Sequence, residues 1–235
     1  GYAGTDYSQI GLDFDYIIIH EAGHEWWGNS VSCKDIADLW IHEGFCTYSE
    51  ALYVECLHGY DTAMMYVNAK KRWLGNKEPI IGDYDVNNEG SGDMYSKGML
   101  ILNTLRHQVD DDELWFDIIY GITQDFFHTT VSTKQIEDYI SRKAGKDFTK
   151  FFDQYLRHPK PPTLVYKLEK KKKNLVISYK WDADVKGFDM PIKMTTSPGK
   201  MEWVTPTEEW QTITVKKMKP GSFELGSDWA YFLED

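Results

Sequence analysis

Two histidines and a glutamate near the start of the chain have the types and the spacing that suit metal chemistry. His20, Glu21 and His24 form the pattern H-E-x-x-H within a stretch with helical character, 14–29. Helical side chains four residues apart share one face, so both imidazoles can reach one ion. Zinc accepts such nitrogens at about 2.0–2.1 Å. Glu21, about 100° further round the helix, would lie beside the metal as a general base.

Two histidines do not complete a zinc site, so the pattern predicts a third ligand. Glu43 follows His24 after eighteen intervening residues, at the start of a second helical stretch. That gap accommodates a helix end, a loop and the first turns of an adjacent antiparallel helix. His20, His24 and Glu43 would leave a fourth position for water or substrate, as in catalytic zinc sites.

Two less specific interpretations of these residues exist. Cys46, one helical turn after Glu43, is an alternative ligand, although a small buried hydrophobe is the ordinary role of such a cysteine. The two histidines could also be hydrogen-bonded helix residues that hold no metal.

Three longer motifs add a family resemblance. HEAGHEWWGN, then WIHEGF, then MYSKGMLIL is similar to the gluzincin zinc aminopeptidases, the family of aminopeptidase N and leukotriene hydrolase. The resemblance runs from about Asp15 to the C-terminus and is most specific between His20 and Tyr95. It implies an α+β multidomain protein that holds one zinc ion per chain and removes N-terminal residues from peptide substrates.

Two features depart from the family pattern. His42 stands where the family often has asparagine. The family's G-x-M-E-N motif, whose glutamate holds the α-amino group of the substrate, is absent from these 235 residues. We therefore expect that this chain is a fragment and that its missing front carries the motif. The fragment by itself should bind zinc but hydrolyse peptides weakly.

The resemblance also implies a donor for the oxyanion that forms during peptide hydrolysis. Tyr95 matches the tyrosine of the family's Y-x-K-G block and begins a helical stretch after a long polar loop. A donor of this kind is worth about 3–4 kcal/mol. Tyr84, inside the loop, is the weaker candidate because it lacks the K-G context. Glu50, two turns beyond the candidate carboxylate ligand, is either a hydrogen-bond partner of a ligand histidine or a surface glutamate.

Composition excludes several other classes of protein. The chain is 42% hydrophobic and 15% aromatic, which is enough for a packed core. A net charge of -11 argues against nucleic acid, and no apolar run approaches the ~20 residues of a membrane span. Three cysteines without a CxxC pair do not support a disulfide framework, and the N-terminal residues lack the features of a signal peptide. Nothing indicates an oligomeric state.

A segment rich in proline, HPKPPT, divides the chain. Six or seven helical stretches precede it. Beyond it, TLVYKLEK and NLVISYKW alternate with period two around a KKKN turn, which predicts a hairpin. We predict a mainly helical, thermolysin-like zincin catalytic domain over 1–160 and a small β-sandwich of about seven strands over 161–235. The lysines at 170–173 are interpreted as a solvated turn rather than a binding patch.

Two other functions remain open. A thermolysin-type endopeptidase shares the ligand set, although the WIHEGF and YSKG blocks disfavour it. A catalytically silent relative that acts as a scaffold would be expected to have lost a ligand or the base. The present chain retains all four residues, His20, Glu21, His24 and Glu43.

Overall fold

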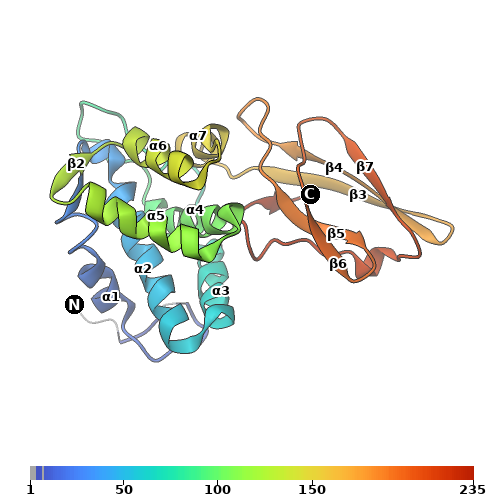
Figure 1. The fold of residues 1–235 in the computed structure, drawn as a ribbon, viewed down its shortest axis with the longest axis horizontal. Helices are drawn as coiled ribbons and strands as arrows, with labels where there is room; N and C mark the ends of the chain where they lie inside the picture. Colours follow the sequence, from blue (N-terminus) through green and yellow to red (C-terminus); the bar gives the residue numbers. More distant parts are fainter. Residues whose placement is uncertain (1–3, 7) are drawn as a thin grey trace. The chain divides into compact units, whose positions relative to one another are not determined.

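The computed structural model describes residues 4–6 and 8–235. The chain has an α+β fold and divides into two compact units, Gly1–Thr149 and Lys150–Asp235 (Figure 1). The first unit contains nearly all of the helices and the second contains the larger sheet. The division into domains at 1–160 and 161–235 stays a prediction. No helix in the described part of the chain is both long and apolar enough to cross a membrane.

Over residues 4–6 and 8–149, the first unit is built from six α-helices and one small sheet. The helices are α1 (Tyr16–Gly23), α2 (Trp40–His58), α3 (Tyr60–Ala69), α4 (Met94–Val109), α5 (Asp112–Asp125) and α6 (Thr133–Ala144). Short 3-10 turns at Ile36–Asp38 and Lys70–Trp73 precede α2 and follow α3. The sheet pairs β1 (Val31–Cys33) in parallel with β2 (Thr129–Val131).

Helix α1 is shorter than its sequence predicts. The side chain of Asp15 accepts a hydrogen bond from the amide of Ile17, and this cap begins the helix. The hydrophobic pattern extends to about Gly28, but the helix ends at Gly23. The amide of Trp27 still donates to the carbonyl of Gly23, at 3.0 Å, and Trp27 then forms a bridge with Val31. The helix therefore ends early because the residues after Gly23 turn toward β1.

Helices α2 and α4 approach each other closely because each carries a glycine at the crossing. A Cβ atom built on Gly98 would lie 2.6 Å from the Cα of Gly44, closer than real Cβ contacts allow. Helix α4 is buried along most of its length. The crossing brings the first turn of α4, with Tyr95, beside the first turn of α2, with Glu43.

Two tryptophans tie α2 to the helices behind it. The indole of Trp40 donates to the hydroxyl of Thr133 at 2.7 Å, and the indole of Trp115 donates to the hydroxyl of Tyr48 at 2.9 Å. Both indoles are fully buried. Helix α6 begins with the capping box that its S-x-x-Q sequence predicts, with Ser132 at the N-cap. Hydrogen bonds to α5 and α6 thus hold helix α2 in place.

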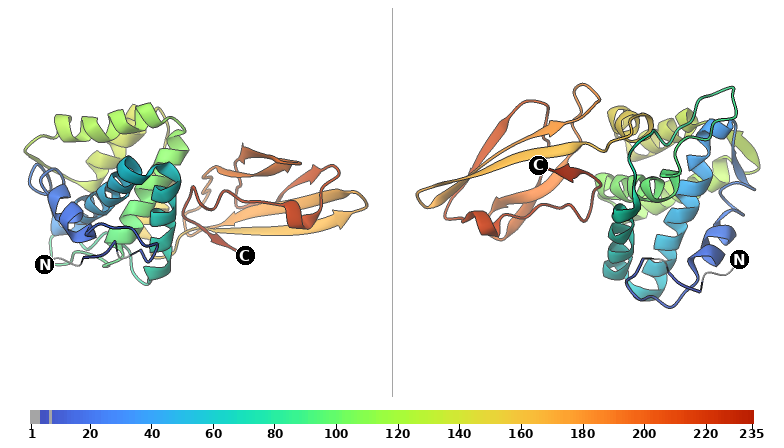
Figure 2. Two further views of the ribbon diagram at one scale, coloured as in Figure 1. Left: turned by 90° about the horizontal axis from the view of Figure 1, so that it is seen from below. Right: turned by 180° about the vertical axis from the view of Figure 1, so that it is seen from behind.

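The second unit contains α7 (Thr149–Arg157), which begins at its border, and six strands (Figures 1 and 2). The strands are β3 (Thr163–Lys171), β4 (Asn174–Asp182), β5 (Ile192–Ser197), β6 (Lys200–Val204), β7 (Gln211–Val215) and β8 (Leu233–Glu234). One sheet has the order β7-β4-β3-β8, and β5 and β6 form a separate hairpin. The predicted β3–β4 hairpin is present, with Lys171 opposite Asn174. Every second residue of β4 is buried, which gives the sheet its apolar face.

Candidate metal centre

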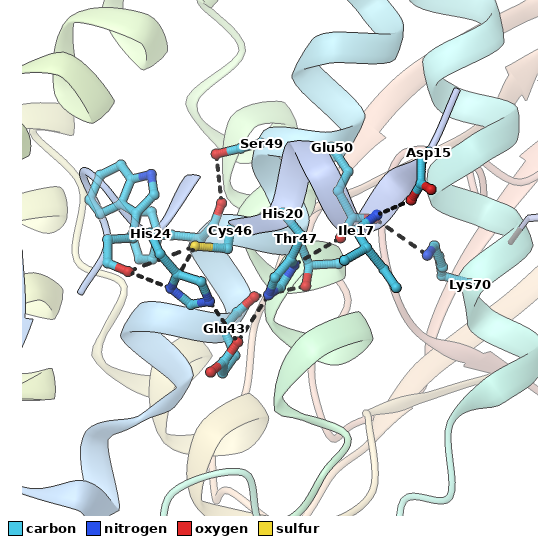
Figure 3. Close-up of polar contacts among 12 residues, drawn as sticks. Asp15, Ile17, His20, His24, Glu43, Cys46, Thr47, Ser49, Glu50 and Lys70 are labelled. Atoms are coloured by element: carbon cyan, nitrogen blue, oxygen red, sulfur yellow. Dashed lines mark hydrogen bonds and ion pairs between the residues drawn. The ribbon is translucent and has the colours of Figure 1, made fainter. Parts of the chain in front are cut away.

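The three predicted ligands converge on one point (Figure 3). Glu43 Oε2 lies 3.0 Å from His20 Nε2 and 3.6 Å from His24 Nε2. Donor atoms that share one tetrahedral zinc ion at about 2 Å lie about 3.3 Å from one another. The two distances fall on either side of that value, so the carboxylate of Glu43 is placed to share a metal ion with either imidazole.

The thiol of Cys46 lies near the same histidines but on another side of them. Cys46 Sγ, His20 and His24 offer donor atoms within 4.8 Å of one another. However, the sulfur contacts His24 Nδ1, at 3.3 Å, while Nε2 of that ring faces Glu43. Burial raises the pKa of the Cys46 thiol well above its usual value, and nearby carboxylates raise it further. A protonated thiol on the Nδ1 side of the ring is compatible with a packing role, which stays a prediction.

Backbone and side-chain acceptors orient the two imidazoles. His24 Nδ1 lies 3.0 Å from the carbonyl oxygen of Trp27 and donates to it when Nε2 carries the lone pair. His20 Nδ1 lies 2.9 Å from Glu50 Oε1. Glu50 is 1% exposed, so it is a buried partner of His20 rather than a surface glutamate. Both rings thereby keep Nε2 directed to Glu43.

Glu50 belongs to a buried polar network. The hydroxyl of Tyr66 donates to Glu50 Oε2, and the ammonium group of Lys70 lies 3.4 Å from the same oxygen. That ammonium also stands over the rings of Tyr16 and Tyr66, at 5.1 and 4.8 Å from their centroids. Lys70 is 6% exposed, so its charge depends on Glu50 and the two rings for compensation.

The electrostatics of the cluster favour a cation at its centre. Burial by itself lowers the pKa of His20, but the hydrogen-bonded carboxylates of Glu43 and Glu50 raise it to about 9. Burial raises the pKa of Glu43, but the hydrogen bond from His20 and the neighbouring imidazoles bring it below the usual value. Without metal, the positive charge between the two carboxylates is therefore a proton on His20.

Glu21 and Tyr95 line the same cavity as the three ligands, a space of about 680 Å³. Glu21 is exposed to solvent. The ring of Tyr95 stacks on that of His20, with centroids 5.7 Å apart and planes inclined by 28°. Burial, followed by the carboxylate of Glu43, raises the pKa of the Tyr95 hydroxyl to about 12. The hydroxyl is thus a neutral donor at physiological pH.

Tyr84, the weaker candidate, lies elsewhere. Its hydroxyl donates to Asp38 Oδ1 at 2.7 Å, and it is not among the residues that line the cavity. The structure therefore brings together five predicted residues, and they are His20, Glu21, His24, Glu43 and Tyr95.

The sequence profile of one family, described as the Peptidase family M1 domain, matches residues 9–155. The chain belongs to peptidase family M1.

Curated relatives agree with this assignment. The M1 chain is 25% identical over 166 residues to aminopeptidase N of Lactococcus lactis subsp. lactis, covering 63% of the chain and 19% of the relative. It is 31% identical over 111 residues to aminopeptidase N of Streptomyces lividans, covering 40% and 13%. The chain thus spans a fifth or less of the length of these two relatives.

Solved structures show the same fold. Aminopeptidase A of Legionella pneumophila, solved in complex with aspartic acid, matches with a TM-score of 0.72 and 18% identity, over 94% of this chain and 26% of the other. An M1 zinc metallopeptidase from Deinococcus radiodurans, bound to a Tyr-Ser-Ala substrate, matches with a TM-score of 0.53 and 22% identity, over 61% and 33%.

His42, which stands where the family often has asparagine, forms a hydrogen bond to the backbone of β1. Its Nε2 accepts a hydrogen bond of 2.7 Å from the amide of Cys33, which ties β1 to the start of α2. Burial lowers the pKa of His42. A neutral imidazole is the form that can accept this bond, so the departure from asparagine still provides an acceptor.

Several features of the site were not predicted from the sequence. Tyr16, Lys70 and Trp73 line the cavity beside the ligands. Lys70 begins a KKR run that reads as an exposed helix end, so its burial had no local signal. The adjacent Trp26 and Trp27 predict two rings packed behind the site. Trp27 packs on Phe45, with 4.3 Å between ring centroids, whereas Trp26 is 55% exposed.

Proposed function

We propose that this chain is the catalytic and β portion of a zinc aminopeptidase that acts on peptides, with one zinc ion per chain. The observation that carries the proposal is the convergence of His20, His24 and Glu43 in a cavity that Glu21 and Tyr95 also line. We further propose a thermolysin-like zincin catalytic domain over 1–160 and a β-sandwich over 161–235. The likeness in fold to M1 structures supports this architecture.

His20, His24 and Glu43 would hold the metal, which supplies Lewis-acid activation of water and of the scissile carbonyl when bound. Glu21 takes the proton of the attacking water and returns it to the leaving amine. The hydroxyl of Tyr95 donates to the developing oxyanion, and its raised pKa keeps the proton in place until then. Stacking on His20 holds the phenol ring at the site.

The names of the relatives favour an aminopeptidase over an endopeptidase of thermolysin type. An endopeptidase would cleave N-terminally blocked peptides, whereas an aminopeptidase requires a free α-amino group. A catalytically silent scaffold is disfavoured because the chain retains the three proposed metal ligands, His20, His24 and Glu43. It also retains the proposed general base, Glu21. We expect the 235 residues alone to turn over slowly, since the amine-binding G-x-M-E-N motif is not among them.

Metal content tests the proposal directly. Mass spectrometry of the purified chain should find about one zinc per chain, and Glu43→Ala should lose it. Glu113→Ala, at an exposed position in the first turn of α5, is the matched control and should keep the metal. A wild-type chain that takes up no zinc after reconstitution would overturn the metal assignment. Rapid hydrolysis of aminoacyl substrates by the chain alone would contradict the expected weak activity.

A further inference from the structure

Seven lysines gather at one end of the sheet in the second unit. Four of them, at 170–173, end β3 and form its turn into β4, and three more follow β7, at 216, 217 and 219. Strand β4 lies between β3 and β7, and its residue Leu175 is opposite Lys170 on one side and Val215 on the other. The pairing therefore brings two basic segments, more than forty residues apart, to the same end of the sheet.

The lysine cluster encloses a hollow of about 260 Å³. The residues that line it are Lys170, Lys172, Lys173, Lys217, Met218 and Lys219. Met218 is 4% exposed, while the lysines are exposed to solvent. Lys171, which does not line the hollow, pairs with Glu169 at 3.2 Å. Among the described residues, none of the five lining lysines forms an ion pair.

Both basic turns hold a lysine in the left-handed region of backbone conformation. Lys172 has φ 57° and Lys217 has φ 55°. Glycine or asparagine adopts this left-handed conformation with less strain than lysine does. The amide of Lys217 lies 3.4 Å from the side-chain oxygen of Asn174, which fixes the second loop against the hairpin. Two strained turns are thus held side by side, each with a cation at its bend.

The positive charge stands out against an acidic chain. Residues 1–149 contain 11 Lys and Arg against 25 Asp and Glu, while residues 150–235 contain 15 against 12. Without the seven clustered lysines, the second unit would also be acidic. Like charges that crowd one hollow repel each other and attract a multiply charged anion.

We propose that this hollow binds a compact ligand that carries several phosphate groups. A lysine ammonium is a compact charge with three donors on a flexible stem, which suits phosphate oxygens in varied arrangements. The hollow is smaller than the ~300–1,000 Å³ of pockets for drug-sized ligands, so it fits a small polyphosphate. The net charge of -11 on the whole chain disfavours an extended polyanion such as nucleic acid. The site is independent of the proposed peptidase activity.

Clustered phosphates have two possible sources, a free polyphosphorylated small molecule and a phosphoinositide headgroup in a membrane. The probes for the first source are inorganic tripolyphosphate and inositol hexakisphosphate, titrated calorimetrically into the full 235-residue chain. The probes for the second are phosphatidylcholine vesicles with and without phosphatidylinositol bisphosphate, tested by co-sedimentation. Both are measured at low and at physiological salt, because exposed charges are screened.

The test variant combines Lys172→Gln, Lys217→Gln and Lys219→Gln. Its matched control combines Lys160→Gln, Lys186→Gln and Lys200→Gln, three exposed lysines of the same unit that lie outside the hollow. Both variants lose the same net charge, so a difference between them reports the hollow and not the overall charge. Thermal unfolding followed by circular dichroism verifies that both retain the fold.

Saturable binding that weakens at least tenfold in the test variant and less than threefold in the control supports the site. Such binding of the soluble probes identifies a free ligand as the source, and binding to the phosphoinositide vesicles alone identifies the headgroup. The proposal is overturned if neither kind of probe binds, or if the two triple variants lose affinity equally. Metal content and peptidase activity do not enter this readout, so its failure is distinct from failure of the proposed function.

Discussion

Gly44 and Gly98 meet where α2 crosses α4, and a Cβ atom on Gly98 would lie 2.6 Å from the Cα of Gly44. Each glycine lies close to a residue of the candidate site, Gly44 next to Glu43 and Gly98 one turn after Tyr95. The closeness of the two backbones sets how near the phenol of Tyr95 can come to His20 and Glu43. The glycines of the HEGF and YSKG blocks, which belong to the family motifs, are thus also needed for the close packing of α2 against α4.

Gly98→Ala should separate the two helices and move Tyr95 from His20. We expect a loss of about 1–3 kcal/mol in the free energy of unfolding from overpacking, together with lower kcat. Gly92→Ala is the matched control, because a Cβ there meets nothing within 4 Å. Urea denaturation and kinetics on an aminoacyl substrate measure both effects. Equal stability in the two variants would contradict the crossing as a tight constraint.

Tyr95→Phe removes the proposed oxyanion donor but keeps the ring that stacks on His20. We expect kcat to fall by about 10²–10³ while zinc content stays unchanged. Tyr84→Phe should leave kcat close to that of the wild type, because its hydroxyl bonds to Asp38 outside the cavity. Steady-state kinetics with metal analysis separates the two tyrosines. A larger loss from Tyr84→Phe would reverse the assignment.

Glu50→Gln weakens the acceptor that orients His20, so zinc affinity should fall by about 10–100-fold. The substitution also leaves Lys70 as a buried cation without its carboxylate. Glu50→Gln combined with Lys70→Met should therefore recover stability but not zinc affinity. Competition with a chromogenic chelator gives the affinity. Ser49→Ala, at the preceding helical position, serves as the control and should keep the zinc affinity of the wild type. Unchanged zinc affinity in the Glu50 variants would exclude the orienting role of Glu50.

Zinc binding should release a proton. Because the metal-free pKa of His20 is about 9, its imidazole is charged at neutral pH and must lose that proton before Nε2 can bind metal. Apparent zinc affinity should rise about tenfold per pH unit below pH 9 and then level off. The raised pKa of His20 also stabilises the metal-free fold. This contribution to the free energy of unfolding is fully present below pH 6.5, about the pKa of an unfolded histidine, and it is lost as the pH rises through the folded-state pKa of about 9.

Calorimetry in buffers of different ionisation enthalpy counts the protons released. About one per zinc is expected near neutral pH, and fewer in Glu50→Gln, where one carboxylate that raises the pKa is absent. No proton release in the wild type would mean that His20 is already neutral in the metal-free chain.

Much of the site followed from local sequence, and the remainder needed the fold. The spacing of His20 and His24 fixes a shared helix face, and Glu43 lies within reach in the next helix. Tyr66 and Lys70, by contrast, come to Glu50 from α3 and the turn after it, a contact set by how α2 and α3 pack. No periodicity near those two residues indicates a partner sixteen or twenty positions earlier.

The sequence pattern also does not predict the shortest strands of the first unit. Strand β1 has three residues, too few for an alternation to be recognised, and four α-helices separate it from its partner β2 in the chain. The sequence alone favours a solvated turn for the lysines at 170–173, because charged residues at a hairpin tip usually face solvent. Pairing of β4 with β7 adds the second segment.

The pairing of Val31 with Thr129 has a consequence for the order of folding. It closes a loop of nearly one hundred residues that contains α2, α3, α4 and α5, so it can form only after those helices have collapsed together. His20, His24 and Glu43 lie within a much shorter segment and can meet early. The residues of the candidate site are therefore expected to come together before the parallel strands close the unit.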